Sequence, residues 1–130
     1  DFNGETNYYE NSPINQQNSL IFHNEEQKKI KIQCYKLSEI LELQNISKVD
    51  YINIDTEGNE LKVLIGLDFN IIDPFLLTIE DNSFDLDNKN KKEKINYLET
   101  KKYKLINIIG VTMFFVKKDS VEEISKLIKI

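Results

Sequence analysis

Residues with side chains suited to acid–base chemistry gather at one corner of the sequence. In YINIDTEGNELKVLIGL, residues 51–67, an apolar run passes directly into Asp55, Thr56, Glu57 and Gly58. An apolar run that stops in polar residues is typical of a buried strand, and glycine permits a tight turn into the next helix. Carboxylates at such a corner can orient a hydroxyl group or take its proton. Asp55 directly follows the apolar run, so we expect it to be partly desolvated.

A second pair of carboxylates, Glu80 and Asp81, follows the next apolar run, PFLLTIE. Ligands of open α/β sheets bind at the carboxyl ends of the strands, so both pairs are expected to project toward one rim of the sheet. All four acids are therefore expected where this architecture places its ligands.

Two other interpretations of these acids stay open. Glu57 and Glu60 lie next to the start of a predicted helix, where acids favour the positive end of the helix dipole, and this role alone could explain them. Asp55, Glu80 and Asp81 could instead hold a divalent cation such as Mg²⁺, which binds carboxylate oxygens and lowers the pKa of a bound hydroxyl. The spacing permits this metal site without requiring it.

The apolar pattern predicts an α/β fold. Two runs that are polar only at their tips, 49–54 and 74–80, are typical of parallel central strands covered on both faces. A helix predicted over 59–66 would supply the right-handed crossover between them. Residues 103–117 predict an antiparallel β-hairpin, which completes the second half of a doubly wound sheet. The other predicted elements are strands over 5–9, 19–23 and 29–34, and helices over 36–44, through 95–98 and over 121–128.

Composition limits the classes of partner and compartment. The net charge is −5, and all 17 basic residues are lysine. An acidic chain without arginine lacks the planar guanidinium that contacts phosphate and guanine in a bidentate manner, so nucleic acid is not an expected partner. No apolar run approaches the ~20 residues that span a bilayer. A single cysteine permits no internal disulfide, so a reduced, cytoplasmic setting is expected.

Three further features are expected to be structural. His23, the only histidine, is expected to be exposed and inert, and Cys34, the only cysteine, to be buried filler. The charged run NKNKKEK, residues 88–94, is interpreted as a solvated helix face.

The acidic corner resembles the signature of the FkbM-type methyltransferases, in which a hydrophobic strand ends in Asp-x-Glu-Gly and leads into Glu-x-x-x-Leu-x-Gly. These positions are filled here by Asp55, Glu57, Gly58, Glu60, Leu64 and Gly66. YKLSEIL before the corner, LLTIE after it and YLETKKYKLINIIGVTMFFVKK near the end resemble further segments of that family in the same order. The resemblance thus covers residues 30–118, whereas 1–29 match only loosely.

The resemblance implies a partial Rossmann-like sheet of the class I methyltransferase type, here the C-terminal part of a methyltransferase domain. Residues 1–130 are expected to form one domain, with a polar strand and loop lead-in over 1–29, the family-like core over 30–118 and a terminal helix over 119–130. The glycine-rich cofactor loop of the family has no counterpart, because no Gly-x-Gly occurs among the 4 glycines.

The activity implied by the resemblance is S-adenosylmethionine-dependent O-methylation of a sugar or another small metabolite. In this interpretation Asp55 orients or deprotonates the acceptor hydroxyl, Glu57 and Glu80 flank it, and Asp55 and Thr56 contact the cofactor. Mg²⁺ remains a possible second cofactor. The alternative is a non-catalytic α/β interaction module that has lost its cofactor site.

Overall fold

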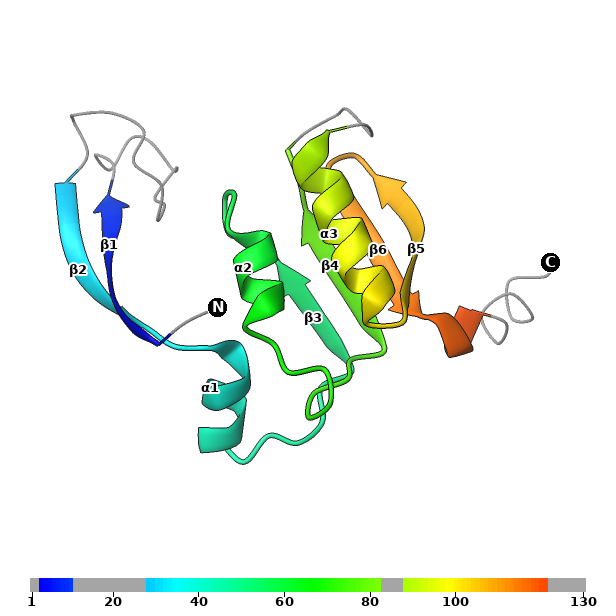
Figure 1. The fold of residues 1–130 in the computed structure, drawn as a ribbon, viewed down its shortest axis with the longest axis horizontal. Helices are drawn as coiled ribbons and strands as arrows, with labels where there is room; N and C mark the ends of the chain where they lie inside the picture. Colours follow the sequence, from blue (N-terminus) through cyan, green and yellow to red (C-terminus); the bar gives the residue numbers. More distant parts are fainter. Residues whose placement is uncertain (1–2, 11–27, 83–87, 122–130) are drawn as a thin grey trace.

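The computed structural model describes residues 3–10, 28–82 and 88–121, and Figure 1 shows the order of their elements. Two regions are separate in sequence and in space, a β-hairpin near the N-terminus and a four-stranded sheet with its helices. The described elements are β1 (Gly4–Glu10), β2 (Lys28–Cys34), α1 (Leu37–Leu43), β3 (Tyr51–Ile54), α2 (Glu60–Ile65), β4 (Leu76–Glu80), α3 (Lys89–Thr100), β5 (Tyr103–Ile109), β6 (Thr112–Lys117) and the 3-10 turn η1 (Lys118–Ser120).

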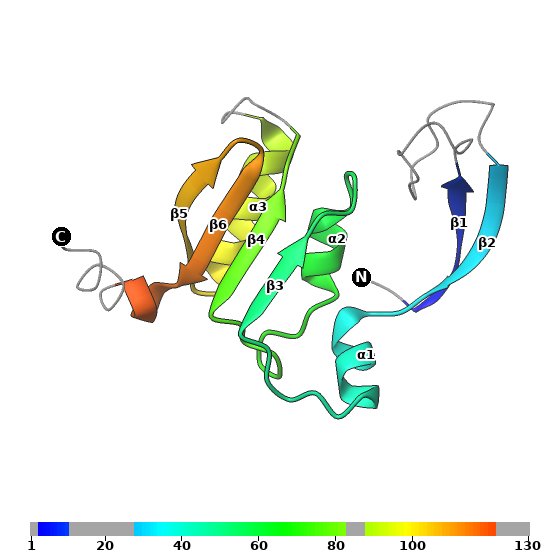
Figure 2. The ribbon, with the colours of Figure 1, turned by 180° about the vertical axis from the view of Figure 1, so that it is seen from behind.

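The four-stranded sheet has the strand order β3-β4-β6-β5. Strands β3 and β4 are parallel, with Ile54 opposite Ile79, and β4 pairs with β6 antiparallel. Strands β5 and β6 form the predicted antiparallel hairpin, whose turn contains Gly110 at φ 61°. The predicted parallel pair and hairpin are therefore confirmed. The prediction that the first strand is central is wrong for the described sheet, because β3 forms its edge (Figure 2).

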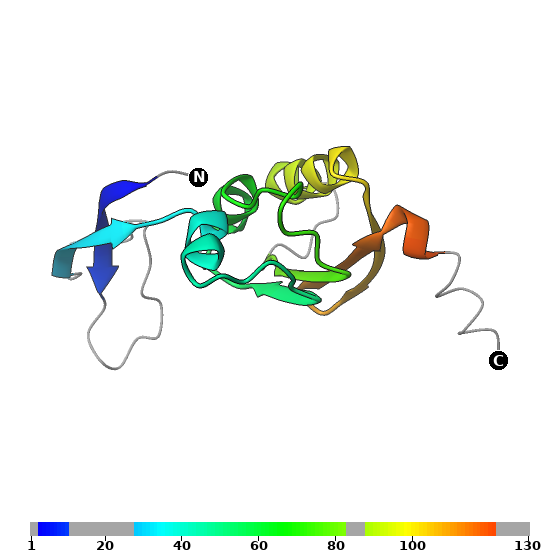
Figure 3. The same cartoon turned by 90° about the horizontal axis from the view of Figure 1, so that it is seen from below.

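The helices α2 and α3 cover one face of this sheet, as the edge-on view in Figure 3 shows. No described helix covers the opposite face (Figure 2), so the two-sided covering expected of a doubly wound sheet is not present among the described elements. That face buries a polar residue instead: Thr78 donates a hydrogen bond to Asn53 Oδ1 (2.6 Å) and lies 2.7 Å from the Tyr51 hydroxyl. These bonds satisfy a hydroxyl that would otherwise be costly to bury.

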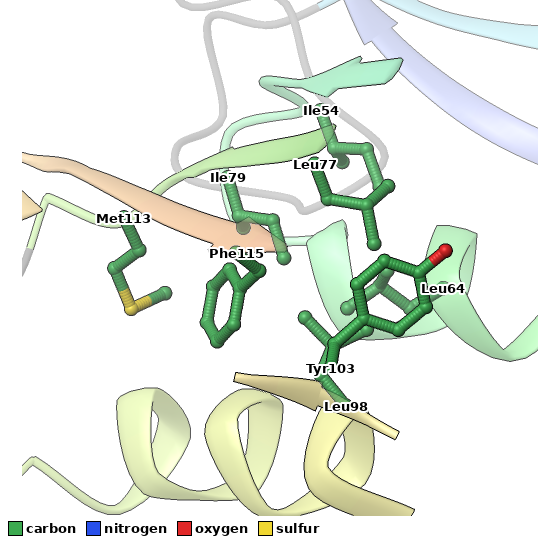
Figure 4. Packing of buried hydrophobic residues seen from close by; sticks show 8 residues of the cluster. All are labelled: Ile54, Leu64, Leu77, Ile79, Leu98, Tyr103, Met113 and Phe115. Atoms are coloured by element: carbon green, nitrogen blue, oxygen red, sulfur yellow. The ribbon is translucent and has the colours of Figure 1, made fainter. Parts of the chain in front are cut away.

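The hydrophobic core lies between the sheet and its helices (Figure 4). Leu64 from α2 and Leu98 from α3 are fully buried against the sheet. The strands contribute the other residues of this cluster: Ile54, Leu77, Ile79, Tyr103, Met113 and Phe115. Burial of large apolar side chains from both layers is the main force that fixes the helices over the sheet. The core therefore also fixes the ends of β3 and β4, where the predicted site lies.

The β1–β2 hairpin forms a separate antiparallel sheet, in which Tyr8 lies opposite Ile30 (Figure 1). Its link to the main body includes Asn3, whose Oδ1 accepts a hydrogen bond from the Lys36 backbone N–H just before α1 (2.9 Å). Cys34, at the end of β2, is half-buried and free. The prediction of Cys34 as buried filler is therefore wrong, because a two-stranded sheet has no second layer to cover it.

The bounds of the described helices agree with the predictions to within a few residues, but the exposure of the charged run in α3 does not. α3 begins after Asn88, whose Oδ1 accepts a hydrogen bond from the Asn90 N–H (2.9 Å), so the charged run enters the helix as predicted. The run is not a solvated face, however, because Lys91 and Lys94 are 1% and 6% exposed. None of the described helices is long and apolar enough to cross a membrane.

Parts of the sequence predictions lie outside the described residues. These are the strand over 19–23, His23 and all of the terminal helix after residue 121. The start of the predicted terminal helix, residues 119 and 120, belongs to the 3-10 turn η1.

Candidate functional site

The corner after β3 is a tight loop with two residues in left-handed backbone conformations. Gly58 has φ 102°, a region that favours glycine because it has no Cβ, and this agrees with its predicted role in the turn. Glu57 has φ 51°, which is uncommon for a residue with a side chain. A non-glycine residue in this region persists where surrounding contacts hold the backbone in place.

The contacts that hold this loop come from Glu60, the first residue of α2. Its Oε1 accepts hydrogen bonds from the Gly58 N–H (2.8 Å), the Thr56 N–H (3.2 Å) and the Thr56 hydroxyl (3.2 Å). Glu60 is only 3% exposed. Burial raises its pKa, but hydrogen bonds from the backbone N–H groups of Gly58 and Glu60 and the charge of Lys94 outweigh burial, so the pKa lies below its ordinary value. The ionised Glu60 carboxylate thus holds the loop in place through these hydrogen bonds.

A lysine of α3, Lys94, connects the end of β4 to Glu60. The Lys94 ammonium lies 2.7 Å from Asp81 Oδ2 and 3.2 Å from Glu60 Oε2. All three side chains are buried. The two carboxylates supply the opposite charge that a buried ammonium group needs. Lys94 therefore compensates the charge of Asp81, which was predicted to share the rim.

The acids left at the rim are Asp55 and Glu80. Ile54 and Ile79 are register partners in the parallel pair, so the residues that follow them in the chain, Asp55 and Glu80, lie at the same end of the sheet. A hydrogen bond with Asp55 and the charge of Asp55 are the main causes that raise the pKa of Glu80, and burial, Glu57 and Glu60 add to the rise. Two carboxyl groups in contact resist double ionisation, so this pair retains a proton more readily than an isolated acid.

Two predictions about the rim need correction or refinement. Asp55 is exposed, not partly desolvated, because β3 is the edge strand of the described sheet and no neighbouring strand shields its tip. Glu57 is also exposed, and its Oε2 accepts a long hydrogen bond from Asn82 (3.5 Å). The loop is held by Glu60 and not by Glu57. Thr56 is half-buried and donates to Glu60 with both its N–H and its hydroxyl.

A cavity of about 280 Å³ collects these groups at the carboxyl ends of β3 and β4. The predicted site residues Asp55, Glu57, Glu80 and Asp81 all line it, and Thr56 does not. Its remaining lining residues are Gly58, Glu60, Asn82, Asn88, Asn90 and Lys94. The asparagines at the start of α3 and Lys94 were missed, since nothing in a charged run indicates which of its side chains turn inward.

A larger cavity, of about 410 Å³, lies at the other end of the sheet. Asp73 lines it, but this acid pairs with Lys117 and accepts a hydrogen bond from the Tyr103 hydroxyl (2.9 Å). Size alone therefore does not favour that cavity as a reaction site. The smaller cavity has the uncompensated pair of acids, and we place the candidate site there.

Within residues 3–10, 28–82 and 88–121, no group of three His, Cys, Asp or Glu side chains is arranged to hold a metal ion. The acids that were considered as ligands divide between two roles, because Asp81 pairs with Lys94 while Asp55 and Glu80 contact each other.

The parallel β3–β4 pair, its crossover helix and the acids at the carboxyl rim define an α/β domain with a polar site at the strand ends. The family model described as the methyltransferase FkbM domain matches residues 2–107, so the chain belongs to the FkbM methyltransferase domain family. The match includes most of the lead-in, which was expected to be only loosely similar, and ends within β5. No curated protein and no solved structure matches the chain.

Proposed function

We propose that this domain takes part in S-adenosylmethionine-dependent methyl transfer to a hydroxyl group of a sugar or another small metabolite. Membership in the FkbM methyltransferase family supports the methyl transfer. The hydroxyl acceptor is supported by the chemistry of the rim, where a carboxyl pair suits removal of an O–H proton. Asp55 is the proposed group that orients or deprotonates the acceptor, with Glu80 and Glu57 beside it.

The observation that carries this proposal is the contact between Asp55 and Glu80. Contact with Asp55 and its charge raise the pKa of Glu80, so Glu80 holds a proton more readily than an isolated acid. Methyl transfer to oxygen forms a C–O bond, breaks the C–S bond of the donor and releases the hydroxyl proton. Asp55 would receive that proton, and its exposure at the strand tip leaves it accessible to an acceptor.

The residues present fit one part of the methyl donor. S-adenosylmethionine supplies the methyl group when bound, and its amino and sulfonium groups are cationic, which suits a cavity lined by acids. Asp55 is the proposed contact to that end, whereas Thr56, the other predicted contact, does not line the cavity and donates to Glu60 instead. The ribose and adenine would need a glycine-rich turn, and no Gly-x-Gly occurs among the 4 glycines of these residues.

Calorimetry tests this division of the cofactor site. S-adenosylmethionine titrated into the 130-residue chain is expected to give little heat, because the glycine-rich turn is not among its residues. The full-length protein is expected to bind. Tight binding by the 130-residue chain would show that the cofactor site is misplaced.

The proposed partner is a small-molecule or glycan acceptor and not nucleic acid, as the net charge of −5 and the absence of arginine support. The proposed location is the cytoplasm, which a single cysteine supports.

Isotope-labelled methyl transfer from S-adenosylmethionine to a panel of sugars and other hydroxyl compounds tests the activity. Transfer to amino acceptors but not to hydroxyls would overturn the O-methylation proposal. A full-length protein that binds no S-adenosylmethionine and transfers no methyl group would favour the non-catalytic module.

A further inference from the structure

Lys94 contacts two acids that belong to different strand ends. Its ammonium lies 2.7 Å from Asp81 and 3.2 Å from Glu60, and the three side chains are buried together under the rim. Asp81 directly follows the last residue of β4, whereas Glu60 follows the loop after β3. One charge from α3 therefore joins the carboxyl ends of both parallel strands.

On the β3 side, Lys94 acts through the carboxylate of Glu60. One oxygen of this carboxylate holds Thr56 and Gly58 through their backbone N–H groups, and the other oxygen binds Lys94. Thr56 is the neighbour of Asp55, so fixing its backbone restricts where the Asp55 carboxylate can lie.

On the β4 side, Lys94 acts through Asp81, the neighbour of Glu80 in the chain. The Asp81 backbone N–H donates to the Val111 carbonyl oxygen in the β5–β6 turn (2.8 Å), while its side chain binds Lys94. The backbone that follows Glu80 is therefore held from both sides, by the hairpin turn and by α3.

We propose that Lys94 is a positioning residue that sets the separation of Asp55 and Glu80 by joining Glu60 and Asp81 beneath them. This role rests on the proposed methyl transfer. A buried ion pair is weak evidence for stability, because well-packed apolar residues are often at least as stabilising. An ion triad at this point is better explained as a device that positions the two rim acids. A misplacement of about 1 Å at a reacting group can reduce a rate ~10²-fold.

The test must separate geometry from stability. The single variant Lys94→Met leaves two buried carboxylates without a countercharge and is expected to unfold readily. The triple variant Lys94→Met/Glu60→Gln/Asp81→Asn removes all three charges and nearly preserves the side-chain volumes. A milder variant, Asp81→Asn, removes the ion pair between Lys94 and the end of β4 and keeps the Lys94–Glu60 pair. Matched controls are Lys89→Met on the exposed side of α3 and Asp50→Asn, whose ion pair with Lys48 is exposed.

The measurements are kcat and KM of the full-length protein, with each rate normalised to the folded fraction. The triple variant and Asp81→Asn are expected to lose ~10–10² in kcat while KM for the donor and acceptor changes little. The two controls are expected to match wild type. In an Asp55→Asn background, the triple substitution is expected to add little further loss, because the group that it positions is already inactive.

Two results would overturn this role. One is a folded triple variant, or a folded Asp81→Asn variant, with wild-type kcat. The other is the same fold-loss in the Asp55→Asn background as in wild type, which would make Lys94 independent of Asp55. A wild-type protein that transfers no methyl group would overturn the proposed function and this role with it. Normal turnover in wild type and in the triple variant would overturn the positioning role alone.

Discussion

The two ends of the four-stranded sheet contain acids in opposite surroundings. At the carboxyl ends of β3 and β4, Asp55 and Glu80 contact each other, and the hydrogen bond and the charge of Asp55 raise the pKa of Glu80. At the other end, Asp73 pairs with Lys117 and accepts a hydrogen bond from the buried Tyr103. One end contains a carboxyl pair whose charges oppose each other, and the other contains an acid whose charge is compensated.

This difference separates a structural acid from a candidate reactive one. Asp73 helps to satisfy the Tyr103 hydroxyl, which also contacts the Pro74 carbonyl oxygen inside the core. Burial and Asp73 together raise the pKa of Tyr103, so the phenol stays protonated as a donor. Asp55 has no such structural partner of opposite charge among the described residues. The ionised form of Glu80 is disfavoured by Asp55, so this pair is the candidate for function.

The same substitution at the two ends should have opposite consequences. Asp55→Asn removes the charge at the rim, and methyl transfer is expected to fall by roughly 10²–10⁴-fold with folding intact. Asp73→Asn is expected to leave methyl transfer unchanged and to lower the free energy of unfolding by about 1 kcal/mol, because a partly exposed ion pair contributes little. Methyl-transfer rates and urea unfolding of both variants test the contrast.

Two results would change this interpretation. Near-normal turnover of Asp55→Asn at saturating donor and acceptor would remove Asp55 from the mechanism. Recovery of this variant with excess Mg²⁺ would reassign Asp55 from base to metal ligand.

Tyr103→Phe tests the compensated end in a second way. The variant keeps the buried ring but leaves the Pro74 carbonyl oxygen without the hydroxyl, so a loss of about 1–3 kcal/mol in the free energy of unfolding is expected. Methyl transfer by the folded variant should not change, because Tyr103 lies at the end of the sheet away from Asp55. Denaturant titration measures the first effect. A fall in kcat without a loss of stability would show that the two ends are coupled.

Glu80→Gln tests the repulsion at the rim through its pH dependence. The pKa of Glu80 in the folded protein lies above its ordinary value of 4.5, so the wild-type free energy of unfolding declines as pH rises from 4.5 through the folded pKa. The glutamine amide cannot ionise, so the variant is expected to gain stability relative to wild type over that window. The gain should be at most about 1 kcal/mol, because the group is partly solvated. Thermal melts across this window should show a difference that grows with pH, and a difference that shrinks would contradict the shared proton.

Glu57→Gln should have the smallest effect. Glu57 is exposed, its contact with Asn82 is long, and Glu60 holds the loop. If Glu57 only complements the dipole of α2, the free energy of unfolding should fall by about 0.3–1 kcal/mol, and the short helix favours the lower value. The matched comparison is Glu60→Gln, which is expected to destabilise more because that side chain is buried and bonded to Lys94. Equal losses in the two variants would contradict the conclusion that Glu60 holds the loop.

Local sequence determined much of the fold and the position of the rim. The apolar runs that became β3 and β4 were long enough to be recognised, and one helix-sized segment between them required a parallel crossover. Gly58 and Gly110 marked turns because each backbone has a positive φ. Parallel strands necessarily place their carboxyl ends together, and for that reason Asp55 and Glu80 were predicted at one site.

Tertiary structure alone decided how the charges are distributed around that rim. In sequence Lys94 is one of several lysines in a charged run, and its burial depends on Asp81, 13 residues away, and on Glu60 across the loop from β3. Periodicity reports apolar faces and carries no information about which charged side chains find partners. Likewise, Asp55 is exposed because β3 lies at the edge of the described sheet, a consequence of strand order and not of the residues beside it. The sequence by itself determined which acids meet, and only the packing of α3 against two strand ends decided which of them are neutralised, because compensation of a charge depends on distance in space.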